Sequence, residues 1–121
     1  MSVHQESYAR GELHAALSNA IVRITAEYTG RGPTRARTII SGDWIFVTLV
    51  DTLTKGERRL GENGREESVR STRREYQDVM REEFTAEVER LTGRKVSAFM
   101  SDNHIDPDVA IEVFMLEAQP E

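Results

Sequence analysis

The first third of the chain carries apolar residues at helical spacing. Between Glu6 and Tyr28 they recur at steps of three and four, which is typical of one face of an amphipathic helix. Gly30, Gly32 and Pro33 follow, and such residues commonly end a helix. The apolar stripe of this predicted helix consists of Leu13, Leu17, Ile21, Ile24 and Tyr28.

The next stretch, ARTIISGDWIFVTLVD at residues 36–51, changes to strand-like spacing. Its β-branched and aromatic content, interrupted by Ser41, Gly42 and Asp43, predicts two strands joined as a hairpin. Thr54 is followed three residues later by Glu57, a spacing typical of a capping box at the start of a short helix.

A long second helix is predicted from Arg65 to Leu91, because apolar residues again follow a helical stripe there. KVSAFMS and VAIEVFML then predict two further strands, with a loop from Asp102 to Asp108 between them. The stripe of the second helix is expected to contain Val69, Tyr76, Met80, Phe84, Val88 and Leu91.

The predicted order of elements is α-β-β-α-β-β with short connections. Hairpins imply antiparallel pairing, so we expect an α+β fold with two layers, built from a four-stranded, mainly antiparallel sheet and two main helices. A length of 121 residues suits one domain, and we expect residues 1–121 to form it.

Composition narrows the function classes. The formal net charge is −5, from 21 acidic and 16 basic side chains, which argues against a general nucleic-acid binder because phosphate contacts need basic surface. The chain has no cysteine, which excludes disulfides and thiolate chemistry. Neither a signal-peptide core nor an apolar run of membrane-spanning length is present, so we expect a cytoplasmic protein.

Several motifs together resemble a known bacterial family. They are GRGPTRART after the first helix, VTLVDTLTKGERRL at the hairpin end, LTGRKVSAFMSD and IEVFML. This series resembles the MpsC-like family, named for a sodium-translocating, membrane-potential-generating system linked to bicarbonate or carbon dioxide supply. The resemblance covers roughly Glu6 to Leu116. It implies a small accessory protein and a membrane-system partner, and it brings no catalytic residues with it.

The segment GRGPTRAR at residues 30–37 is a candidate anion site. Its glycines allow backbone N–H groups to converge, and its three arginines supply positive charge, so bicarbonate, a carboxylate or phosphate would suit it. The alternative is a structural corner whose arginines pair with acidic neighbours, and the segment matches no specific phosphate-binding loop. The candidate anion-binding residues are Arg31, Gly32, Thr34, Arg35 and Arg37.

The sequence gives little support for a metal site or for a catalytic nucleophile. His104 with Asp102, Asp106 and Asp108 has ligand-type side chains, but the spacing lacks the glycine and terminal glutamate of a calcium loop, so a polar hairpin loop is the preferred interpretation. No serine lies in a nucleophile elbow. We therefore expect no metal, no cofactor and no catalytic residues.

The strands suggest self-association. In DWIFVTLVD both alternating faces are apolar, whereas a sheet with one wet face shows polar residues at every second position. If both helices cover one face, the other needs a cover, and a second copy related by a two-fold axis would provide it. The expected interface residues are Trp44, Phe46 and Phe114. The alternative places one helix on each face of the sheet.

The leading expectation is a non-enzymatic accessory or regulatory protein that acts through protein contacts and binds a small anion. Two alternatives stay open at this point. One is a small lyase or hydrolase that uses carboxylates at the end of the sheet. The other is a nucleic-acid-binding regulator that uses the patch from Arg31 to Arg37.

Overall fold

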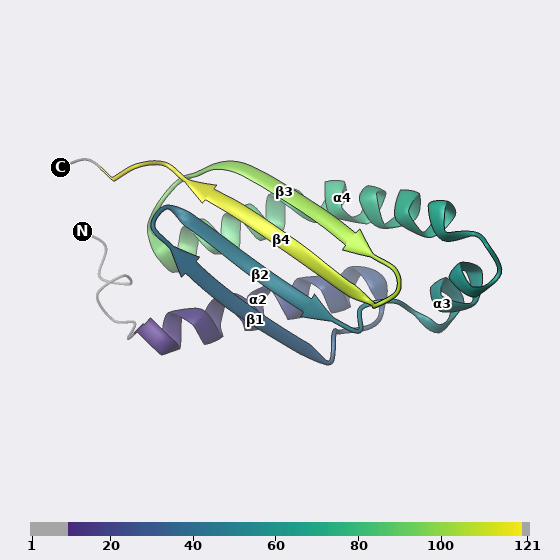
Figure 1. Cartoon of the computed structure of the whole chain (residues 1–121). Coiled ribbons are helices and arrows are strands. Elements are labelled where there is room, and N and C mark those ends of the chain that lie inside the picture. The colour runs from purple at the N-terminus through teal and green to yellow at the C-terminus, as the bar shows by residue number, and fades with distance from the viewer. Residues whose placement is uncertain (1–9, 120–121) are drawn as a thin grey trace.

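A computed structural model describes residues 10–119 of the chain. Figure 1 shows a sheet with two helices behind it and a short third helix beyond one end of the strands. The predicted helix start at Glu6 lies outside the described residues. In chain order, the elements are α2 (Arg10–Thr29), β1 (Arg35–Ser41), β2 (Trp44–Val50), α3 (Lys55–Glu62), α4 (Glu66–Thr92), β3 (Val96–His104) and β4 (Val109–Leu116).

The four strands lie in the order β1-β2-β4-β3, and every neighbouring pair is antiparallel. Both long helices pack on the same face of this sheet (Figure 1), where their apolar stripes join one core. The expected α+β fold with two layers is therefore confirmed, and so is the placement of both helices on one side. We call the helix-covered side the inner face and the other side the outer face.

The core lies between the inner face and the two long helices. Three phenylalanines form its centre: the Phe99 ring lies 5.9 Å from the Phe84 ring and 5.1 Å from the Phe114 ring. Burying aromatic and aliphatic side chains of this size supplies the main driving force for folding. The other large side chains that become fully buried in this core are Leu17, Ile21, Ile24, Ile45, Val47, Leu49 and Val88.

Helix α3 begins with the capping box expected from the sequence. The Thr54 hydroxyl accepts a hydrogen bond from the backbone N–H of Glu57, whose carboxylate in turn accepts one from the N–H of Thr54. Such a cap typically stabilises a helix by about 1 kcal/mol. Beneath this segment a second, smaller apolar cluster of Leu53, Val69 and Ile105 fixes the end of the sheet.

Two details differ from the sequence-based prediction. Strand β3 continues through Asp102 to His104, where a loop was expected, because these residues pair with the start of β4. Edge strands often carry polar side chains, so the polar sequence from Asp102 to His104 did not indicate a strand. Along α4, Tyr76 is exposed, and the polar residues Arg73 and Gln77 take buried positions on the stripe instead.

Candidate functional site

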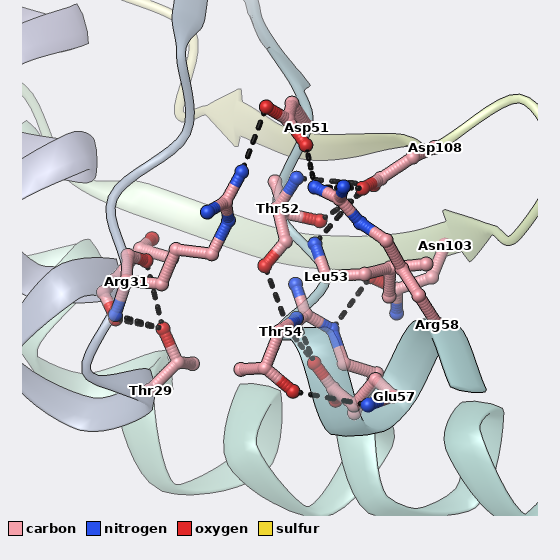
Figure 2. Close-up of polar contacts among 12 residues, drawn as sticks. Thr29, Arg31, Asp51, Thr52, Leu53, Thr54, Glu57, Arg58, Asn103 and Asp108 are labelled. Atoms are coloured by element: carbon pink, nitrogen blue, oxygen red, sulfur yellow. Dashed lines mark hydrogen bonds and ion pairs between the residues drawn. The ribbon is translucent and has the colours of Figure 1, made fainter. Parts of the chain in front are cut away.

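Charged side chains gather where β2 ends, at the end of the sheet nearest α3 (Figures 1 and 2). Asp51 follows the last residue of β2 with a positive φ of 64°, a conformation that aspartate adopts more easily than most residues. Its carboxylate pairs with Arg31 at 2.7 Å and also with Arg58 of α3. We call Arg31, Asp51, Arg58 and Asp108 the sheet-end cluster.

Asp108 ties the loop after β2 to the start of β4. One carboxylate oxygen accepts hydrogen bonds from the backbone N–H and the hydroxyl of Thr52, at 3.0 and 3.2 Å. The other accepts the N–H of Leu53 at 3.0 Å (Figure 2). Both carboxylate oxygens of Asp108 therefore accept hydrogen bonds from the chain itself, and they hold the loop that follows β2 in place.

A buried ion pair lies beside the cluster. Arg73 of α4 is only 4% exposed, and its guanidinium contacts the Glu57 carboxylate at 3.3 Å and the Thr52 carbonyl at 3.4 Å. It also points an N–H toward the Asn103 side chain at 3.5 Å. Arg73 thus links α4 to the loop before α3 and to β3.

Glu112 is a buried acid on the inner face of β4. One of its carboxyl oxygens accepts a hydrogen bond from the Ser101 hydroxyl at 2.9 Å, and the other has no hydrogen-bond partner among the described residues. Burial raises the pKa of Glu112 to about 8, although the Ser101 hydrogen bond and the positive charge of Arg73 both act to lower it. At neutral pH this side chain is therefore largely protonated.

A hollow of about 550 Å³ opens between the sheet-end cluster and α3. Its lining carries five carboxylates against one guanidinium, so its charge disfavours an anion. Within residues 10–119, no three histidine, aspartate or glutamate side chains are placed so that they could hold a metal ion together. The residues around this hollow are Asp51, Leu53, Arg58, Gly61, Glu62, Glu66, Ile105, Asp106 and Asp108.

The candidate anion-binding residues do not converge on one point. Arg31 turns toward Asp51, whereas Arg35 and Arg37 lie on the outer face of β1. Gly32 packs against helix α2, and the N–H of Thr34 donates to the Val50 carbonyl at 3.0 Å. The connection between α2 and β1 is therefore held in the fold by contacts of Arg31, Gly32 and Thr34. Anion binding at this segment stays a prediction.

The outer face is apolar across its middle and charged at two corners. No helix within residues 10–119 covers it (Figure 1), and Ile39, Trp44, Met100 and Val109 are among the exposed large apolar side chains of the chain. Read from β1 across to β3, its four rows are Arg35, Val50, Val109 and His104; Arg37, Thr48, Ile111 and Asp102; Ile39, Phe46, Val113 and Met100; and Ser41, Trp44, Met115 and Ala98.

Two of the three expected interface residues lie on this face. Trp44 and Phe46 stack on one another there, with ring centroids 6.3 Å apart. The placement of Phe114 at an interface was wrong: it pairs with Ile45, shares the inner face and is completely buried in the core. Successive residues of a strand point to opposite faces, so Val113 and Met115 take the outer positions instead.

The residues that sequence reasoning missed share a signal. Arg73 lies four residues after Val69, and Glu112 has the same parity along β4 as Phe114. Both positions share the spacing of residues that the structure buries, but the spacing along β4 does not say which of its two faces is buried. The sheet-end pairs of Asp51 and Asp108 had no such signal, because they join segments that are far apart in the sequence.

These features define a class of protein: a two-layer α+β chain whose antiparallel sheet carries helices on one face and leaves an apolar face open. No described helix is long and apolar enough to cross a membrane. The chain belongs to the MpsC family, because the family described as "Na+-translocating membrane potential-generating system (MpsC)" matches residues 9–118. The resemblance found in the sequence is thereby confirmed. Searches among curated proteins and among solved structures found no match.

Proposed function

We propose that this chain is a non-enzymatic accessory protein of a sodium-translocating, membrane-potential-generating system, and that it acts on the cytoplasmic side through its outer face. Family membership suggests the system. The arrangement of charged side chains supports a role other than catalysis, because the carboxylates of the sheet-end cluster are engaged in ion pairs and backbone hydrogen bonds.

The observation that carries the proposal is the open outer face. Large contiguous apolar patches are uncommon on monomeric proteins and mark interaction surfaces. This face extends over all four strands, and its central residues on β2 and β4 are apolar except for Thr48. A binding surface of this kind fits a protein partner better than a small polar substrate.

The first occupant of the outer face in this proposal is a second copy of the chain. The charged side chains of the outer face are confined to two of its corners, with Arg35 and Arg37 at one corner and Asp102 at the other. An apolar centre with charges at its margin is the usual pattern of a homodimer interface. Small anions, including bicarbonate, remain candidate ligands of Arg35 and Arg37, whose side chains form no ion pair with the described residues.

We expect sedimentation at micromolar concentration to show twice the chain mass, and Trp44→Glu to shift the protein to monomer. A carboxylate at this position would have to be buried without a partner in the dimer, which is strongly unfavourable. Tyr76→Glu is the matched control, because Tyr76 on α4 and Trp44 are both 36% exposed. A monomeric wild-type protein, or dissociation caused only by Tyr76→Glu, would contradict the proposed dimer.

The role of the outer face in the system can be tested in cells that carry the remaining components. We expect replacement of the chain by Trp44→Glu to reduce the sodium-dependent membrane potential toward the level of a deletion strain. The Tyr76→Glu strain should retain the potential, measured with a potentiometric dye at matched protein levels. Full potential in the Trp44→Glu strain would show that the outer face is dispensable for this role.

A further inference from the structure

The outer face carries a projection and a hollow at opposite ends of its strands. At one end, the stacked rings of Trp44 and Phe46 stand on β2. At the other end, where β2 and β4 carry valine, threonine and isoleucine instead of large aromatic side chains, a hollow of about 410 Å³ opens over β2, β4 and β3. Its outer-face lining consists of Thr48, Val50, Asp102, His104, Val109 and Ile111.

Two symmetric arrangements bring the outer faces of two copies together. A two-fold axis that exchanges facing surfaces lies in the plane between them. When the strands of the two copies are aligned, as is common for packed sheets, the axis runs either across the strands or along them. An axis across the strands, through the middle of the sheet, sets the row of Trp44 over the partner's row of Val50 and Val109. Each projection then meets the partner's hollow.

An axis along the strands gives a different set of contacts. Strand β1 then faces the partner's β3, which brings Arg37 opposite the partner's Asp102. Trp44 would face the partner's Met115, so the bulky ends would meet and the two hollows would face each other. This arrangement gains a pair of ionic contacts at the margin and loses close packing at the centre.

The balance between these effects favours packing. Ion pairs between exposed side chains contribute little, because both partners are already well solvated. Buried tryptophans in close-fitting pockets, in contrast, are among the residues that dominate interface affinity. In stable protein interfaces, the centre is packed about as closely as a protein interior, so an arrangement that leaves two hollows facing each other is disfavoured.

We propose that the two-fold axis runs across the strands, and that Trp44 of each copy inserts into the hollow at Val50 and Val109 of the other. The inference rests on the homodimer proposed above and adds its geometry. Trp44 thereby becomes the principal contact residue, and the hollow becomes its receptor site on the same chain. A face that holds both a projection and a hollow is complementary to itself.

A projection-and-hollow exchange tests this geometry. Trp44→Ala removes the projection, and Val109→Trp fills the hollow at a residue that is 37% exposed, which allows the monomer to fold. We expect each variant alone to dimerise at least about tenfold more weakly than wild type. In an equimolar mixture, the intact Trp44 of the second variant meets the open hollow of the first. The indole introduced by Val109→Trp meets the space that Trp44→Ala has cleared.

The mixture should therefore form a heterodimer with nearly wild-type affinity, measured by sedimentation with one variant fluorescently labelled. Circular dichroism and thermal melting of each variant check that the monomers are folded. With an axis along the strands, Trp44 and Val109 do not meet, so the mixture would dimerise no better than the average of the two variants. That result, with wild type still dimeric, would overturn the proposed geometry alone.

A second exchange probes the other arrangement directly. Arg37→Asp and Asp102→Arg should each have only a small effect, and mixing them should give no preference for the heterodimer. Strong heterodimer formation from this pair would place the axis along the strands and overturn the inference. A wild-type protein that is monomeric at all concentrations would overturn the homodimer and its geometry together, and would leave the outer face to a different partner.

Discussion

Replacing Arg73 with methionine is expected to lower the free energy of unfolding by about 3 kcal/mol. Methionine keeps most of the aliphatic volume of the arginine stem, so the loss reports mainly on the guanidinium. Without it, the Glu57 carboxylate and the Thr52 carbonyl lose a buried partner at 3.3 and 3.4 Å. Urea denaturation followed by circular dichroism gives the measurement.

The neighbouring Arg74 provides the control for this variant. Its guanidinium pairs with Glu67 at 2.8 Å, but both side chains are largely exposed to solvent. We expect Arg74→Met to cost less than about 1 kcal/mol, as is usual for exposed ion pairs. Equal losses from Arg73→Met and Arg74→Met would show that the buried pair does not stabilise the end of the sheet.

A double variant separates the ion pair from the rest of the Arg73 environment. Glu57→Gln removes the negative charge but keeps a side-chain oxygen that can accept the N–H of Thr54. Once the charge at residue 57 is gone, removal of the Arg73 guanidinium no longer leaves a carboxylate without its counter-ion. The cost of Arg73→Met should therefore be smaller in the Glu57→Gln background, and a double-mutant cycle measures the difference.

The sequence predicted most of the fold because its local signals agree with the tertiary structure. Helical spacing from Leu13 to Ile24 and the Thr54–Glu57 capping box both correspond to observed elements. The interruption at Gly42 and Asp43 likewise marks the observed hairpin turn, where Gly42 has a φ of 59°. Each of these signals depends on residues that are close together in the chain.

The candidate site was less accessible to such reasoning. Asp51 contacts Arg31 and Arg58 only after α2, β2 and α3 have assembled. No spacing along the sequence therefore predicts the sheet-end cluster. On β4, the single acidic residue Glu112 suggests that its parity faces solvent. The structure instead buries Glu112 beside Phe114, and the apolar parity of Val113 is the one on the open face.

Buried Glu112 also gives rise to a dependence of stability on pH. Burial raises its pKa from 4.5 to about 8 in the folded chain, whereas the unfolded chain releases the proton near the ordinary value. Between these two pH values, the folded chain binds more protons than the unfolded chain. The contribution of Glu112 to stability must therefore decrease as pH rises from 4.5 to about 8, and level off above that range.

Glu112→Gln should remove this dependence. Glutamine has nearly the same shape, stays neutral at every pH and keeps an oxygen to accept the Ser101 hydroxyl. We expect the stability of the variant relative to wild type to increase with pH by up to roughly 1.4 kcal/mol for each pH unit within the window. Urea denaturation at several pH values between about 5 and 8 provides the comparison, since the titration of all other groups cancels in the difference.

Glu62→Gln serves as the control, because the Glu62 side chain on α3 is 66% exposed. Its stability relative to wild type should stay nearly constant over the same pH values. If the Glu112→Gln difference is equally flat, the folded chain does not hold a proton on Glu112, and the acid must be ionised in place. The nearby positive charge of Arg73 would then outweigh the cost of burial, and Arg73→Met would be expected to restore the pH dependence.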